Sequence, residues 1–155
     1  MSAEFVMAVG IPGCGKSKYI KNNFVGGLVV SPDNIRKELY RDVSYQENNV
    51  LVWQRAIGRI EGALYLGKRV ALDATNTKFD EWSNMISKFP KCKKIAWVFH
   101  VEPCIAQARI QRDIFNRVDR ANVPIEMIEK YYDNFKKTVE KLPKYFDFIK
   151  NINNS

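Results

Sequence analysis

Residues 10–17 form a glycine-rich segment that reads Gly-Ile-Pro-Gly-Cys-Gly-Lys-Ser and follows the pattern G-x-x-x-x-G-K-S. Glycines allow successive backbone N–H groups to turn toward phosphate oxygens, and the helix that follows adds the positive end of its dipole. We expect Lys16 to reach the β- and γ-phosphates of ATP, and Ser17 to offer its hydroxyl to Mg²⁺, which prefers oxygen ligands. The predicted phosphate-binding residues are Gly10, Gly13, Cys14, Gly15, Lys16 and Ser17.

A second group of reactive side chains lies in Ser-Pro-Asp-Asn-Ile-Arg at 31–36. Asp33 can accept the proton of an attacking hydroxyl, and Arg36, one helical turn later on the same face, can hold an anion of the acceptor. A structural alternative exists for both residues. An acid in the first turn stabilises a helix by about 0.3–1 kcal/mol, and Arg36 can be a solvated surface charge. We predict Asp33 as a catalytic base and both residues as acceptor-binding.

The segment Asp-Ala-Thr-Asn at 73–76 follows a third apolar stretch. Asp73 is placed to hold a water molecule bound to Mg²⁺, so Ser17 and Asp73 are the predicted metal residues. Thr75 and Asn76 can give neutral hydrogen bonds to an acceptor. The alternative is a loop-forming sequence that supplies the cap of the next helix.

Several arginines lie in and just after a predicted helix, before the segment Val-Pro at 123–124. A hinged segment of this kind can close over a triphosphate, where an arginine on the transferred group is worth roughly 10³–10⁵ in rate. The alternative is an exposed helix whose arginines pair with Asp113 and Asp119. The arginines in question are Arg109, Arg112, Arg117 and Arg120.

Short apolar runs alternate with amphipathic stretches along the chain, which predicts an α/β three-layer domain around a mostly parallel sheet of four to five strands. Ligands gather at the carboxyl ends of such strands, so the residues above should converge on one crevice. The expected strands are 5–9, 28–30, 69–73, 95–99 and the edge strand 146–149. The expected helices are 16–24, 32–40, 45–66, 79–89, 102–115 and 124–141. We expect one domain over 1–150 and a frayed tail over 151–155.

The amino-acid composition limits the classes of binding partner and of site that the chain can have. Twenty-five Lys and Arg against 17 Asp and Glu give a net charge of +8, which favours an anionic partner. The single histidine, His100, excludes a His-rich zinc site. No apolar run approaches the ~20 residues needed to cross a bilayer, so we expect no membrane association. Three cysteines leave one unpaired under any disulfide scheme, which suits a cytoplasmic protein. The assembly state is open, a homo-oligomer included.

In combination, the motifs at 10–17, 31–36 and 73–76 and the Arg…Val-Pro segment from Arg109 to Pro124 resemble the P-loop kinase domain of phage 5′-polynucleotide kinases. The resemblance implies a P-loop NTPase/kinase fold with a helical lid. It also implies transfer of the ATP γ-phosphate to the 5′-hydroxyl of single-stranded or end-exposed DNA or RNA, with Mg²⁺. Asp33 matches the family's general base and Arg36 its contact to the acceptor phosphate.

The same resemblance implies a lid arginine that acts on the ATP phosphates. Arg117 matches it best, and Arg112 is the second candidate. A phage-encoded protein would work in the cytoplasm of the host cell. Two other functions stay open: a P-loop kinase of small molecules, such as nucleoside and sugar kinases or zeta toxins, and a nucleotide-dependent binding module. The positive charge favours the polynucleotide kinase.

Overall fold

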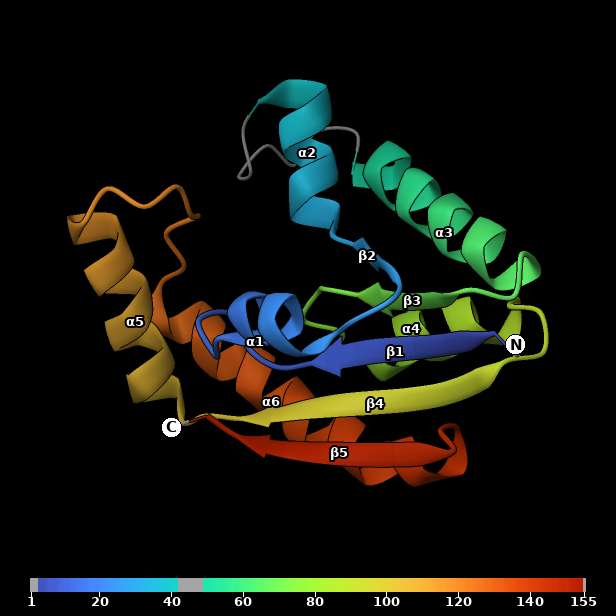
Figure 1. The fold of residues 1–155 in the computed structure, drawn as a ribbon. Coiled ribbons are helices and arrows are strands. Elements are labelled where there is room, and N and C mark those ends of the chain that lie inside the picture. The colour runs from blue at the N-terminus through green and yellow to red at the C-terminus, as the bar shows by residue number, and fades with distance from the viewer. Residues whose placement is uncertain (1–2, 42–48, 155) are drawn as a thin grey trace.

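A five-stranded parallel sheet forms the centre of the molecule, in the order β2-β3-β1-β4-β5. The computed structural model describes residues 3–41 and 49–154. All strands run in one direction, so their carboxyl ends share one edge of the sheet (Figure 1). The predicted α/β class and sheet are confirmed. The strands are β1 (Glu4–Val9), β2 (Leu28–Val30), β3 (Arg69–Leu72), β4 (Lys93–His100) and β5 (Phe148–Asn153).

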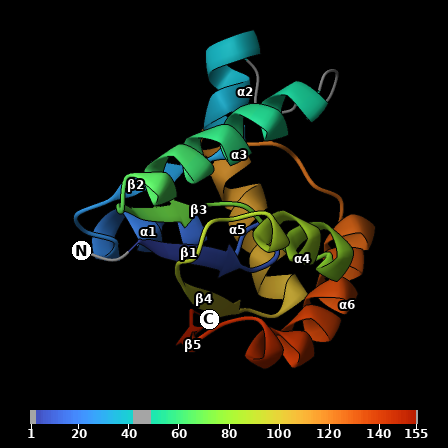
Figure 2. The ribbon, with the colours of Figure 1, turned by 90° about the vertical axis from the view of Figure 1, so that its right-hand side faces the viewer.

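Helices cover both faces of this sheet and complete three layers. Figure 2 shows α1 on one face and α4 and α6 on the other, with α3 lying over β2 and β3. Helix α5 stands beyond the carboxyl ends of the strands (Figure 1). Of the predicted helix 45–66, residues 45–48 lie outside the described residues. The helices are α1 (Lys16–Asn23), α2 (Pro32–Tyr40), α3 (Asn49–Tyr65), α4 (Phe79–Ser87), α5 (Pro103–Phe115) and α6 (Ile125–Lys141).

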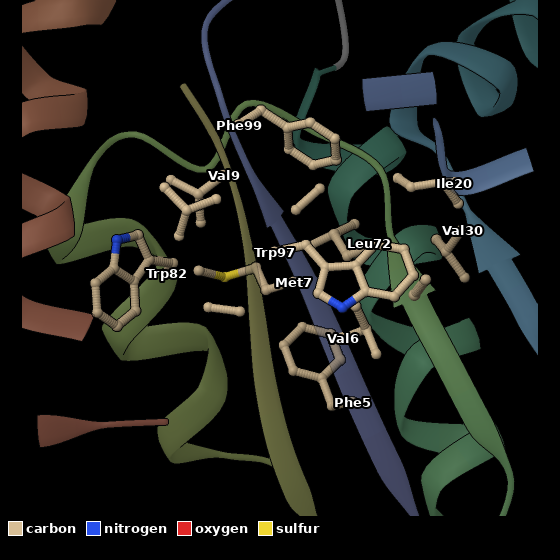
Figure 3. Close-up of a cluster of buried hydrophobic side chains, with 14 of the residues drawn as sticks. Phe5, Val6, Met7, Val9, Ile20, Val30, Leu72, Trp82, Trp97 and Phe99 are labelled. Atoms are coloured by element: carbon tan, nitrogen blue, oxygen red, sulfur yellow. The ribbon is translucent and has the colours of Figure 1, made fainter. Parts of the chain in front are cut away.

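Strand β1 is buried on both faces, which explains its unbroken apolar sequence. Met7 and Val9 lie on the side of the sheet that holds Trp82, whereas Trp97 and Phe99 of β4 lie on the opposite side, toward Ile20 (Figure 3). On that second side, Trp97 and Phe99 meet the ring of Tyr19 edge to face, at 5.6 and 5.4 Å between centroids. Aromatic packing therefore fixes α1, and with it the segment just before α1, against the sheet.

A buried pair of hydrogen bonds joins the helices of the other face. The indole Nε1 of Trp82 donates to Thr138 Oγ1 at 3.2 Å, and Thr138 Oγ1 donates to the carbonyl oxygen of Thr77 at 2.6 Å. Thr138 is fully buried and Trp82 is 2% exposed. These bonds hold α4, α6 and the turn before α4 in one arrangement, because no water can replace a lost partner there.

The end of the chain differs from the prediction. The expected strand 146–149 exists but runs from Phe148 to Asn153, so the prediction of a frayed tail is wrong for residues 151–153. Asn151 and Ile152 pair with Val98 and Phe99 of β4, and Ile152 is 7% exposed. The asparagines around Ile152 concealed the strand, because an edge strand needs few apolar residues and its ladder is made by the backbone.

Candidate active site

The segment between β1 and α1 needs its glycines. Gly13 and Gly15 have φ angles of 83° and 84°, in the left-handed region that other residues rarely adopt. A Cβ atom on Gly13 would lie 2.4 Å from the carbonyl oxygen of Ala106 in α5, and one on Gly10 would lie 2.6 Å from Cys14 Sγ. Cys14 is fully buried, so its thiol is not available to a ligand.

The first turn of α1 meets the end of β3. Ser17 Oγ donates a hydrogen bond to Asp73 Oδ2 at 2.6 Å, and the backbone N–H of Asp73 donates to the carbonyl oxygen of Val30 at 2.8 Å. A hydroxyl and a carboxylate side by side are the hard oxygen ligands that suit Mg²⁺. No group of three or more His, Cys, Asp or Glu suited to a metal ion occurs among residues 3–41 and 49–154, so nucleotide and water oxygens would have to complete the coordination.

Asp33 and Arg36 form an ion pair on α2. Arg36 Nη1 donates to Asp33 Oδ1 at 2.5 Å, and Arg36 Nη2 donates to Asn49 Oδ1 at 2.7 Å. Arg36 is 8% exposed, whereas the Asp33 side chain is 71% exposed. The alternative in which Arg36 is a solvated surface charge is therefore wrong. Asn49, which opens α3, was missed by sequence reasoning because it belongs to no motif.

The helix that carries this pair begins as the sequence predicts. Ser31 Oγ accepts a hydrogen bond from the backbone N–H of Asn34 at 3.2 Å, and Pro32 occupies the first helical position. The cap fixes the first turn, so Asp33 is held at the carboxyl end of β2. Arg36 Nε is buried and has no hydrogen-bond partner among the described residues.

The loop after β3 is fastened to the phosphate loop. The backbone N–H of Gly10 donates to the carbonyl oxygen of Thr75 at 3.0 Å. Asn76 has a φ of 48°, and its Nδ2 donates to the carbonyl oxygens of Ala8 at 2.7 Å and Ala74 at 3.3 Å. The Asn76 amide group thus donates to the backbone, as the loop-forming alternative expects, and only its Oδ1 is left for the predicted acceptor contact. The cap that this alternative also expects is not supplied by the segment, because the N-cap of α4 is Lys78 and has no side-chain cap hydrogen bond.

The arginines of the predicted lid segment differ in their exposure and in their ion pairing. Arg112 and Arg117 are exposed, in the last turn of α5 and just beyond it, and Arg117 has a φ of 59°. Arg120 instead donates from Nη1 to Asp113 Oδ2, which is the ion pairing that the alternative reading of this segment predicts. Of these three arginines, Arg112 and Arg117 are therefore the two that are exposed to solvent.

Two further contacts tie this segment to the rest of the site. Lys37 Nζ of α2 lies 3.0 Å from Asp119 Oδ2, so the segment after α5 reaches across to α2. Arg109 lies beside the phosphate loop, since a Cβ atom on Gly15 would be 3.7 Å from Arg109 Nη1. The sequence groups Arg109 only with the other arginines of this segment, because nothing in the local sequence shows which of them reaches the loop.

This sheet order, with a glycine loop leading from β1 into α1 and a Ser–Asp pair at the loop, defines an α/β three-layer P-loop fold of the kinase-like type. The family model described as an AAA domain matches residues 5–140, and the chain belongs to this family of P-loop domains. No helix in the described part of the chain has the length and apolarity to cross a membrane.

Solved structures share the fold at low identity. One is a chain of the Pnkp1/Rnl/Hen1 RNA repair complex, with a TM-score of 0.80, 20% identity, and coverage of 91% of this chain and 46% of that chain. A second structure of the Pnkp1/Rnl/Hen1 complex gives a TM-score of 0.61 and 17% identity over 79% of this chain and 41% of that one. This chain thus spans less than half the length of both.

A third similar structure is a candidate kinase from Chloroflexus aurantiacus. It has a TM-score of 0.70 and 11% identity, and the match covers 100% of this chain and 90% of that one. At such identities the likeness establishes the fold alone.

Proposed function

We propose that the chain is a polynucleotide 5′-hydroxyl kinase, which transfers the γ-phosphate of ATP to the 5′-hydroxyl of DNA or RNA. The observation that carries the proposal is the buried Arg36, held between Asp33 and Asn49 at the carboxyl end of β2. A buried guanidinium with an unpartnered Nε is suited to an anionic acceptor, and the exposed Asp33 carboxylate beside it is suited to a hydroxyl.

In the proposed reaction, Asp33 accepts the proton of the 5′-hydroxyl while that oxygen attacks the γ-phosphorus of ATP. The bond from the γ-phosphorus to the β,γ-bridging oxygen breaks, and ADP leaves with the bonding electron pair. Phosphoryl transfer depends more on orientation than on base strength, so an exposed carboxylate of ordinary basicity suffices. Arg36 orients the acceptor by holding its first phosphate.

On the nucleotide side, Lys16 binds the β- and γ-phosphates together with the N–H groups of the phosphate loop. Ser17 and Asp73 would hold Mg²⁺, which neutralises charge on the phosphate oxygens when bound. Arg117 and Arg112 are the candidates for the lid arginine that stabilises charge on the transferred group.

Charge and structural similarity support a nucleic acid as the acceptor. The net charge of +8 attracts a polyanion. Two of the similar solved structures are described as complexes of Pnkp1, Rnl and Hen1, one of them an RNA repair complex.

The direct test is transfer of label from γ-labelled ATP, with Mg²⁺, to single-stranded DNA and RNA oligonucleotides that carry a 5′-hydroxyl. The 5′-phosphorylated oligonucleotides serve as matched controls, since they lack only the accepting group. We expect label only in the oligonucleotides that carry a 5′-hydroxyl. The affinity of the protein for these oligonucleotides should fall as the salt concentration rises.

A kinase of small-molecule alcohols is the second candidate. The match to the candidate kinase from Chloroflexus aurantiacus keeps it open, because that protein shares the fold over nearly its whole length and its description names no nucleic acid. Nucleosides and sugars belong in the same assay for this reason. Label in one of them, with none in any oligonucleotide, would replace the polynucleotide kinase by this second function.

A further inference from the structure

We propose that Asn154 is a positioning residue for ATP: its side chain holds the phosphate loop in the shape that binds phosphate. The proposal rests on the nucleotide half of the function proposed above and is independent of the acceptor. Asn154 follows β5 and lies 140 positions from the loop residue that it contacts. Figure 1 shows the end of β5 meeting the start of α5 at the carboxyl edge of the sheet.

The central contact is a hydrogen bond from Asn154 Nδ2 to the carbonyl oxygen of Cys14, at 2.7 Å. The Cys14 carbonyl and the Gly15 N–H belong to one planar trans peptide group, in which they point in opposite directions. A bond that fixes the carbonyl toward Asn154 therefore fixes the N–H on the other side. That N–H is one of the donors that a loop of this sequence turns toward phosphate.

Asn154 is itself held in place. Arg109 Nη2 of α5 donates to the Asn154 carbonyl oxygen, and the preceding residue, Asn153, is paired with His100 of β4. The side chain also lies directly on the loop, because a Cβ atom on Gly15 would come within 2.4 Å of Asn154 Nδ2. The phosphate loop, the end of β5 and α5 thus meet at one residue, Asn154.

Asn154→Asp and Asn154→Ala remove the donor. The first keeps the shape of the side chain and turns a carboxylate toward the Cys14 carbonyl, and the second removes the whole amide group. The matched control is Asn151→Asp, which puts the same new charge on β5 and keeps an oxygen that can accept from His100 Nε2, which lies 2.8 Å from Asn151 Oδ1. Neither Asn151 nor His100 contacts the phosphate loop in a described hydrogen bond.

The measurement is the dissociation constant of ATP by isothermal titration calorimetry, with the Tm of each nucleotide-free variant recorded beside it. Loss of one orienting hydrogen bond should raise the Kd of ATP by roughly 3- to 10-fold in both Asn154 variants. The Asn151→Asp control should bind ATP like the parent. The KM for the acceptor should not change in any variant.

An unchanged Kd of ATP in folded Asn154→Asp and Asn154→Ala would overturn the proposal, whatever their Tm. An equal rise in the Asn151→Asp control would overturn it too, since the effect would then come from β5 in general. A parent that binds ATP but labels no oligonucleotide refutes the polynucleotide kinase and leaves this inference standing.

Discussion

Replacing Asp33 by asparagine separates a catalytic base from a helix-stabilising charge. Asparagine keeps the size of the side chain and an oxygen that can accept from Arg36 Nη1, but it cannot take up a proton. The matched control is Asp133→Asn. Asp133 is 70% exposed, against 71% for Asp33, and it also pairs with a cation three residues later, Lys136, at 3.7 Å. It lies on α6, on the opposite face of the sheet from α1 (Figure 2).

The two effects of Asp33→Asn differ widely in size. Because Asp33 is 71% exposed, its ion pair contributes no more than about 1 kcal/mol to stability. For a domain of 155 residues this lowers the Tm by about 2–4 °C. Loss of a general base lowers kcat by roughly 10²–10⁴-fold. The Kd of ATP should stay near the parent value, since Asp33 is proposed to act on the acceptor.

The assay is the initial rate of transfer to a 5′-hydroxyl oligonucleotide at saturating ATP, together with thermal unfolding of both variants. Asp133→Asn should lose a similar few degrees of Tm and keep its rate. Turnover of Asp33→Asn at the parent rate would refute the assignment of the base. The helix-dipole explanation would then stand, and Asp73 would be the next carboxylate to test.

Three further outcomes are expected. Lys16→Ala should lower kcat/KM by about 10²–10³-fold and leave the Tm unchanged. The control Lys18→Ala, at an exposed neighbouring position, should keep the parent kcat/KM and Tm. A normal rate for Lys16→Ala would refute the phosphate-loop assignment. Arg36→Lys keeps the charge but cannot span Asp33 and Asn49, so the KM for the oligonucleotide should rise roughly 10-fold without a change in the KM for ATP. Thr138→Val leaves the two buried groups that Thr138 bonds without a partner, so the free energy of unfolding should fall by about 2–4 kcal/mol and the Tm by roughly 5–15 °C. Thr138→Ser keeps the hydroxyl, and an equal loss of stability in that variant would contradict the prediction.

Helices and strands whose ends are marked by residues close together in the sequence were predicted near their observed bounds. The cap at Ser31 and the proline after it define the start of α2 within a few residues of sequence. The bounds of β5 could not be found in this way, because its register is set by pairing with β4, about fifty residues earlier. The sequence Phe-Ile-Lys-Asn-Ile-Asn of β5 does not alternate apolar and polar residues, so it lacks the periodicity by which a half-buried strand is recognised.

Within the site, motif residues were easier to predict than the residues that support them. The Ser17–Asp73 contact follows from the rule that ligands collect at the carboxyl ends of parallel strands. Asn49 and Asn154 had no such signal, since each is a single asparagine that contacts its partner only after the chain has folded. Their partners, Arg36 and Cys14, lie 13 and 140 positions away.

The central position of β1 has a consequence for the order of folding. β1 pairs Glu4 with Arg69 of β3 and with Lys93 of β4, and such distant pairings form slowly because long loops must close first. The phosphate loop leaves the ribosome early, whereas Asn154 emerges after the whole sheet has been synthesised. Until β5 has been made, a nascent chain therefore carries the phosphate loop without the hydrogen bond that fixes the Cys14 carbonyl, and on the proposal above we expect full nucleotide affinity only after that strand has joined the sheet.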